Sequence, residues 1–242
     1  MPKQRLDVLV VSLGLCDSRE QAQRLIIAGE VLVKDQPITK PGTKVDDSLP
    51  ITVKNKPKYV SRGGLKLEGA LKAFPVKAEG KICLDIGSST GGFTDCLLQN
   101  GALRVHAVDV GTNQLVWKLR NDPRVIVKEQ FNARYMTPAD LGEKVQLIVS
   151  DVSFISLTKI LPAAYDCLEE GGDLLVLIKP QFELQPEDIG PGGIVRDSAL
   201  HQRAVDKIHD FVVNELHREW MGVADSPITG MEGNKEFLAW LR

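Results

Sequence analysis

Two amines and two carboxylates in this chain have the chemistry needed to remove a proton from a weakly acidic hydroxyl group. They are Lys66, Asp151, Lys179 and Glu236. A neighbouring ammonium and partial burial both favour the neutral form of a lysine, which can then accept a proton. We therefore hypothesise that Lys179 is the principal base or hydroxyl-polarising group and that Lys66 is its electrostatic partner. Asp151 and Glu236 would orient the two amines; the alternative is that each residue is an ordinary surface charge.

A glycine-rich stretch, residues 82–94, joins an apolar run to a tight turn and the start of a helix. Three glycines in it, Gly87, Gly91 and Gly92, let the backbone approach a ligand where a side chain would collide. The unpaired N–H groups at the helix start suit a carboxylate or a phosphate. The spacing matches neither a P-loop nor a dinucleotide-binding fingerprint. The candidate cofactor-binding residues of this turn are Gly87, Ser88, Gly91, Gly92 and Phe93.

Acidic residues near this turn narrow the choice of ligand. Asp85 ends the apolar run, where it would repel a pyrophosphate but attract an ammonium or a sulfonium, and S-adenosylmethionine carries both. Asp109 ends the next apolar run, where a ribose diol is commonly held. Asn132 and Asp151 follow later runs and complete the cofactor-binding candidates. The pattern favours S-adenosylmethionine as cofactor, and the alternative is a structural turn with ordinary surface acids.

The residues near the strand ends also indicate which kind of atom accepts the methyl group. Transfer from a sulfonium needs an aligned nucleophile, plus removal of a proton if the acceptor is a hydroxyl. Methylation of an exocyclic base nitrogen usually requires Asp/Asn-Pro-Pro-aromatic after the fourth strand, whereas this chain has Asp151-Val-Ser-Phe. Methylation at carbon 5 requires a cysteine at the site, whereas Cys167 lies on a predicted helix. A ribose hydroxyl fits the charged residues better.

The elements that must position these side chains follow from residue 81 onward, where strand and helix patterns alternate. Such alternation predicts a parallel sheet with helices on both faces, an α/β fold. Ligands in such sheets bind beyond the carboxyl ends of the strands, where Asp85, Asp109, Asn132, Asp151 and Lys179 are all expected. The predicted strands are 82–86, 104–109, 125–128, 145–151, 173–179, 219–224 and 237–241. The predicted helices include 61–73, 92–100, 157–169 and 200–216.

The N-terminal segment has a different pattern. Residues 5–14 read as a short helix, Ser18 begins a second helix with a capping box, and residues 30–53 form a small curled sheet. Residues 1–60 contain ten Lys and Arg against seven Asp and Glu, a modest basic excess in a chain of net charge −2. Residues 55–60 are polar, contain a proline and are predicted to be a linker between two domains.

This segment resembles the S4 RNA-binding domain, an α+β module, through Arg5-Leu-Asp7, Ser18-Arg-x-x-Ala22, residues 27–33 and Pro41-Gly42. The resemblance implies that a basic helix and loop bind phosphates and the shape of folded RNA. The alternative is a small protein-docking module. The RNA-binding candidates are Arg5, Arg19, Arg24 and Arg62.

The rest of the chain resembles FtsJ-like ribose 2′-O-methyltransferases, through residues 85–93 and the order Lys66, Asp151, Lys179, Glu236. With the S4 segment, the whole chain resembles the TlyA, or haemolysin-A-like, family. The resemblance implies a Rossmann-like S-adenosylmethionine-dependent methyltransferase domain over 61–242, an RNA-binding domain over 1–54, and cytidine 2′-O-methylation in ribosomal RNA. It favours the large ribosomal subunit as partner, and it leaves the target nucleotide and the oligomeric state open.

Other classes of protein are disfavoured by composition. The apolar runs are strand-sized, far below the roughly 18 residues that span a bilayer, and the first residues lack a signal-peptide core. We therefore expect a cytoplasmic protein without a membrane partner. The four cysteines and four histidines show no metal-binding spacing, so no metal is expected. A membrane-active haemolysin and a catalytically inactive RNA-binding protein remain the alternatives.

Overall fold

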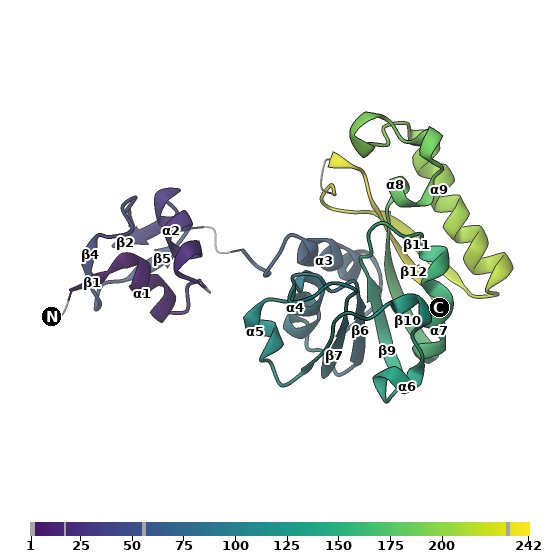
Figure 1. The fold of residues 1–242 in the computed structure, drawn as a ribbon, viewed down its shortest axis with the longest axis horizontal. Coiled ribbons are helices and arrows are strands. Elements are labelled where there is room, and N and C mark those ends of the chain that lie inside the picture. The colour runs from purple at the N-terminus through teal and green to yellow at the C-terminus, as the bar shows by residue number, and fades with distance from the viewer. Residues whose placement is uncertain (1–2, 17, 55–56, 231–232) are drawn as a thin grey trace. The chain divides into compact units, whose positions relative to one another are not determined.

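Three clusters of buried apolar side chains hold the chain together, one in residues 1–58 and two in residues 59–242, which form separate units (Figure 1). The computed structural model describes residues 3–16, 18–54, 57–230 and 233–242. Asn55 and Lys56, which belong to the predicted linker 55–60, lie outside the described residues.

In the N-terminal unit, two helices pack on small antiparallel sheets. The Oγ of Ser18 accepts a hydrogen bond from the N–H of Gln21 at 3.2 Å, so the predicted cap begins the second helix. Leu6 and Ile26 are fully buried where the helices meet the sheet. The helices are α1 (Leu6–Ser12) and α2 (Arg19–Ile27), and the strands are β1 (Lys3–Arg5), β2 (Val31–Val33), β3 (Gln36–Pro37), β4 (Lys44–Asp46) and β5 (Ile51–Val53).

A seven-stranded sheet in the order β11-β12-β10-β9-β6-β7-β8 forms the centre of the second unit. Five of its strands, from β10 to β8, pair in parallel as predicted, and β11 runs in the same direction, but β12 runs antiparallel to both β10 and β11. The prediction of a fully parallel sheet is therefore wrong for this edge. A short connection between β11 and β12 allows an antiparallel pairing, whereas a parallel pairing needs a long crossover. The strands are β6 (Ile82–Ile86), β7 (Arg104–Val108), β8 (Val125–Lys128), β9 (Val145–Ser150), β10 (Leu168–Ile178), β11 (Trp220–Asp225) and β12 (Phe237–Leu241).

Helices cover both faces of this sheet (Figure 1). Successive side chains of β9 alternate between the two apolar clusters, with Ile148 in one and Leu147 in the other. The predicted helix 157–169 is shorter than expected, because a separate 3-10 turn, η2 (Leu157–Lys159), precedes it. The other helices are α3 (Gly63–Ala73), α4 (Gly92–Gln99), α5 (Trp117–Arg120), α6 (Pro138–Leu141), α7 (Leu161–Cys167), α8 (Pro180–Glu183) and α9 (Ser198–Asp210), which continues into a π-helix over Phe211–Glu215.

Candidate active site

The four charged residues singled out in the sequence meet at one edge of the large sheet. Asp151 follows β9, Lys179 follows β10, and Lys66 lies on α3. Glu236 precedes β12, and because this strand is antiparallel to β10, its first residues lie at the edge where β10 ends. The structure therefore brings together residues that are up to 170 positions apart in the chain.

Asp151 lies between the two amines. Its Oδ1 is 2.6 Å from Nζ of Lys179, and its Oδ2 is 3.6 Å from Nζ of Lys66. The same Nζ of Lys66 is 2.7 Å from Oε2 of Glu236. The side chains of Lys66, Lys179 and Glu236 are 11%, 8% and 2% exposed, so the ion pairs are largely shielded from water. Burial of each charge is offset by an opposite charge at short distance.

The two lysines differ in their partners. Lys66 contacts two carboxylates, whereas Lys179 contacts one carboxylate and donates a hydrogen bond to Oγ of Ser153 at 2.9 Å. The two amines are therefore held by different groups, Lys66 between two carboxylates and Lys179 between one carboxylate and a hydroxyl.

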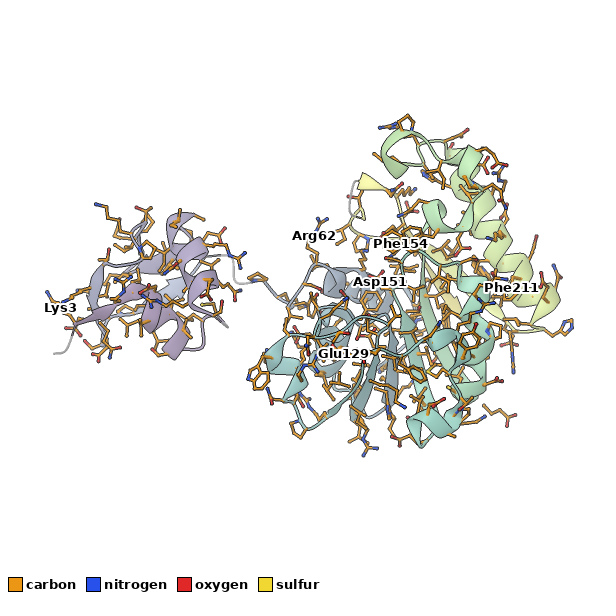
Figure 2. The ribbon with its side chains drawn as sticks, in the orientation of Figure 1. Lys3, Arg62, Glu129, Asp151, Phe154 and Phe211 are labelled. Carbon is orange, nitrogen blue, oxygen red and sulfur yellow. The ribbon has the colours of Figure 1, made fainter. Side chains whose placement is uncertain are left out.

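A cavity of about 740 Å³ opens beside these side chains, within the size range of small-molecule sites. Figure 2 labels three of its lining residues, Arg62, Asp151 and Phe154. Gly87, Ser88, Gly92 and Phe93 of the glycine-rich turn form one part of its wall, and Lys66, Lys179 and Glu236 form another. A ligand in the cavity would therefore contact the turn and the charged residues together.

Two glycines of the turn are required by close packing. Gly87 has φ +82°, and a Cβ there would lie 2.9 Å from the carbonyl oxygen of Asp151. A Cβ on Gly92 would lie 2.3 Å from Oγ of Ser61. Gly91 has φ +100°, and its Cβ would collide with Leu119 rather than with anything in the cavity. Without side chains at Gly87 and Gly92, the backbone of the turn can pack closely against Asp151 and Ser61.

Asp85 is placed differently from the prediction that it directly attracts a cofactor cation. Its side chain is fully buried and is not among the described residues that line the cavity. Its Oδ2 accepts a hydrogen bond from Oγ1 of Thr94 at 2.6 Å. Within the described residues, no donor reaches its Oδ1. Burial raises the pKa of Asp85 to about 7, and the negative charge of Asp151 contributes to the increase.

Asp109 and Asn132 also lie outside the cavity lining formed by the described residues. Both oxygens of Asp109 accept hydrogen bonds at 2.7 Å from backbone N–H groups, those of Ser89 and Gly111. Asp109 thus connects the glycine-rich turn to the loop after β7. Asn132 is exposed, and its side-chain oxygen accepts a hydrogen bond from the N–H of Arg134. A role for either residue in holding the cofactor stays a prediction.

Ser153 and Phe154 are among the cavity residues that were not predicted from the sequence. Ser153 contacts Lys179, and Phe154 is 91% exposed with φ +64°, a backbone conformation that costs energy in a bulky residue. The ring centroids of Phe154 and Phe182 are 5.1 Å apart. The position of Ser153, two residues after a strand-ending acid, is the one sequence signal that could have indicated it.

The four RNA-binding candidates fall in two places. Arg5, Arg19 and Arg24 are exposed on the N-terminal unit. Arg62 lines the cavity of the second unit and donates a hydrogen bond to the carbonyl of Thr229 at 3.2 Å. In the parts of the chain that the structure describes, no cluster of three or more His, Cys, Asp or Glu could hold a metal ion. Among the same residues, no helix is both long and apolar enough to cross a membrane.

Comparison with known proteins assigns both units. A family model described as FtsJ-like methyltransferase matches residues 59–242, and one described as S4 domain matches residues 4–51. The chain is 53% identical over 241 residues to a Bacillus subtilis protein named "Putative rRNA methyltransferase YqxC", an alignment that covers 99% of this chain and 85% of that protein.

Two further relatives align over nearly the whole chain. The 16S/23S rRNA (cytidine-2′-O)-methyltransferase TlyA of Mycobacterium tuberculosis is 47% identical over 240 residues, covering 98% of this chain and 89% of the relative. Hemolysin A of Brachyspira hyodysenteriae is 48% identical over 240 residues, covering 97% of this chain and 98% of the relative.

Proposed function

The chain belongs to the FtsJ-like methyltransferase family, with an S4 domain before the methyltransferase domain, and we propose that it methylates the ribose 2′-hydroxyl of a cytidine in ribosomal RNA. The observation that carries the reaction type is the geometry of Lys179, which lines the cavity between Asp151 and Ser153. The name of the M. tuberculosis relative supports the choice of cytidine and of ribosomal RNA.

Each charged residue has a distinct role in this proposal. Lys179 accepts the proton of the ribose hydroxyl, or polarises its O–H bond, as the oxygen becomes a nucleophile. Lys66 is held by Glu236 and Asp151, so its positive charge stays fixed and stabilises the developing oxyanion. Asp151 holds the amine of Lys179 in place through a 2.6 Å contact. Because the site is preorganised and shielded, little rearrangement is needed when the substrate binds.

We propose S-adenosylmethionine as the cofactor, which supplies a methyl group on a positively charged sulfur. The fit is supported by the glycine-rich turn in the cavity wall, by the cavity volume, and by the carboxylate of Asp151, which lines the same cavity. The backbone from Gly87 to Phe93 would hold the amino acid part of the cofactor. The carboxylate of Asp151 favours a cation nearby.

We propose that the S4 segment, residues 1–54, binds the RNA, that residues 55–60 are a linker, and that residues 61–242 catalyse the reaction. Exposed Arg5, Arg19 and Arg24 are the expected phosphate contacts on the S4 segment, and Arg62 is the expected contact beside the cavity. The finer proposal is that the substrate belongs to the large ribosomal subunit, whose 23S RNA is one of two RNAs in the name of the M. tuberculosis relative. Such a protein would act in the cytoplasm, where ribosomal RNA is found.

The test is direct. Purified 30S and 50S subunits are incubated separately with the protein and methyl-labelled S-adenosylmethionine, and the RNA is digested and examined by mass spectrometry. We expect a labelled 2′-O-methylcytidine from the large subunit. Label on a base or on neither RNA would contradict the proposed function. Label from the small subunit alone would contradict the choice of subunit.

The assignment of Lys179 is tested with Lys179→Ala. We expect its turnover to fall by about 10²–10⁴-fold, the usual contribution of a general base, while calorimetry shows normal S-adenosylmethionine binding. Lys159→Ala, on the η2 turn, is a control that removes one lysine from outside the cavity lining. Normal turnover by Lys179→Ala with cofactor bound would show that this amine is not the base.

A further inference from the structure

The N-terminal unit contains a carboxylate with an unusual set of partners. Asp7, on α1, is fully buried although it is charged. Its Oδ1 accepts a hydrogen bond from Nε of Arg5, and its Oδ2 accepts three more, from Arg5, Arg19 and Gln23, at 2.9, 2.9 and 3.1 Å. Hydrogen bonds from Arg5, Gln23 and Arg19 hold the pKa of this carboxyl well below its usual range, so Asp7 is ionised at neutral pH.

The consequence is that two arginines are fixed side by side. An NH2 group of Arg5 and Nε of Arg19 each lie 2.9 Å from the same oxygen, so these nitrogens are no more than twice that distance apart. The two side chains are 46% and 52% exposed, so part of each guanidinium faces solvent. A guanidinium carries five N–H donors, and contacts with Asp7 engage only some of them. The pair therefore presents two cations at a spacing that one phosphate group can bridge.

We propose that Asp7 is a positioning residue that holds Arg5 and Arg19 as a preorganised pair for one phosphate group of the bound RNA. The inference rests on the proposed function, in which this unit binds RNA. Long side chains lose conformational freedom when they bind a ligand, and a side chain that is already held in place loses less. Gln23 contributes by fixing the same oxygen of Asp7 from the next turn of α2.

This role predicts that removal of Asp7 changes RNA affinity in the direction opposite to that expected from net charge alone. RNA is polyanionic, so removal of a negative charge from a binding surface should strengthen binding and steepen its salt dependence. If Asp7 positions the arginines, its removal should instead weaken binding, although the chain becomes more positive. Loss of one phosphate contact should also reduce the slope of log Kd against log salt by about one.

The experiment compares Asp7→Asn with Asp47→Asn in the full chain. Both variants remove one negative charge from the same unit, and Asp47 is exposed. Kd for 50S subunits is measured over a series of salt concentrations. We expect Asp7→Asn to bind about tenfold more weakly with a shallower salt slope, and Asp47→Asn to bind as tightly as wild type or slightly more tightly. Binding by Asp7→Asn that is equal to or tighter than wild type would overturn the proposal.

Two further variants make the result decisive. If Asp7→Asn lowers the melting temperature of the N-terminal unit, Asp7→Glu replaces it, because it keeps the charge and moves the carboxylate by one methylene. Weakened binding by folded Asp7→Glu supports positioning, and wild-type affinity overturns it. The double variant Arg5→Ala/Arg19→Ala tests the proposed function separately. If it binds RNA as wild type does, RNA binding by these arginines is wrong; if it fails to bind while Asp7→Asn binds normally, only the role of Asp7 is wrong.

Discussion

At the scale of single residues, Asp151 connects the two amines of the site. One of its oxygens faces Lys179 and the other faces Lys66, so a change at this position affects both lysines. Its backbone carbonyl also lies against Gly87 of the glycine-rich turn. Asp151 thus links the residues proposed to take the proton to the turn proposed to hold the cofactor, which makes the two functions hard to separate by substitution here.

Asp85 gives a pH-dependent prediction about stability. Its pKa is raised to about 7 by burial, so between its ordinary value near 3.8 and about pH 7 the folded chain holds a proton that the unfolded chain has lost. The contribution of Asp85 to stability therefore decreases as pH rises through this window and is constant above it. Asp85→Asn cannot titrate and can still accept the hydrogen bond from Thr94.

We expect the melting temperature of Asp85→Asn minus that of wild type to increase from about pH 5 to about pH 8. Differential scanning calorimetry of both proteins without cofactor measures this difference. Taking the difference cancels the titration of all other groups that the substitution leaves unchanged. A difference that stays constant over this range would show that Asp85 is ionised throughout.

The positions of Asp85, Asp109 and Asp151 in the chain could be predicted to lie at strand ends, but the directions of their side chains could not. Asp85, Asp109 and Asp151 each follow or end an apolar run, which places all three at one edge of a sheet. Only Asp151 contacts the lysines, while Asp85 and Asp109 face Thr94 and backbone N–H groups. Side-chain direction at a strand end depends on the local turn and on neighbouring elements, and the pattern of apolar residues does not encode either.

At the scale of elements, two loops that follow neighbouring strands form part of the cavity wall. One follows β9 and carries Ser153 and Phe154, and the other follows β10 and continues into α8. Glu183, at the end of α8, is only 3% exposed and connects them. Its Oε1 accepts a hydrogen bond from the N–H of Leu157 at 2.8 Å, and its Oε2 accepts one from Oγ of Ser156 at 2.5 Å.

Glu183→Gln should therefore loosen the loop after β9. We expect kcat for RNA methylation to fall about tenfold, and stability to fall by roughly 1–3 kcal/mol as buried hydrogen bonds are weakened, with unchanged affinity for S-adenosylmethionine. Lys207 on α9 also loses an ion pair, since its Nζ lies 3.1 Å from Oε2 of Glu183. Steady-state kinetics and calorimetry measure these changes.

Glu187→Gln is the matched control, because Glu187 is an exposed glutamate of the same segment and should tolerate the change. Equal kinetics for the two variants would show that Glu183 does not position the loop.

Most element positions could be predicted, because apolar periodicity and glycine stops give the strands and the longer helices. The direction of β12 could not, since the residues of a strand look alike in either direction. This direction is what places Glu236 at the carboxyl edge, beside Lys66, and only pairing with β10 and β11 determines it.

At the scale of the whole molecule, the chain has two units with separate apolar cores, residues 1–58 and 59–242. We expect a chain lacking residues 1–53 to bind S-adenosylmethionine with normal affinity, because the described residues that line the cavity all belong to the second unit. It should lose productive binding of ribosomal subunits and therefore methylation. Calorimetry and methyl incorporation into 50S subunits test this. Full methylation by the truncated chain would refute this division of labour.

The order of strands also bears on how the enzyme becomes active during synthesis. β12 lies between β10 and β11, although both are translated before it. A nascent chain folds from its N-terminal end, so the RNA-binding unit and most of the sheet emerge while the place of β12 is still empty. Until that strand is inserted, Glu236 is absent from the site and Lys66 lacks the nearer of its two counter-ions. We therefore expect a nascent chain to bind RNA before it can methylate it. Methylation activity would appear only when β12 is inserted, late in synthesis.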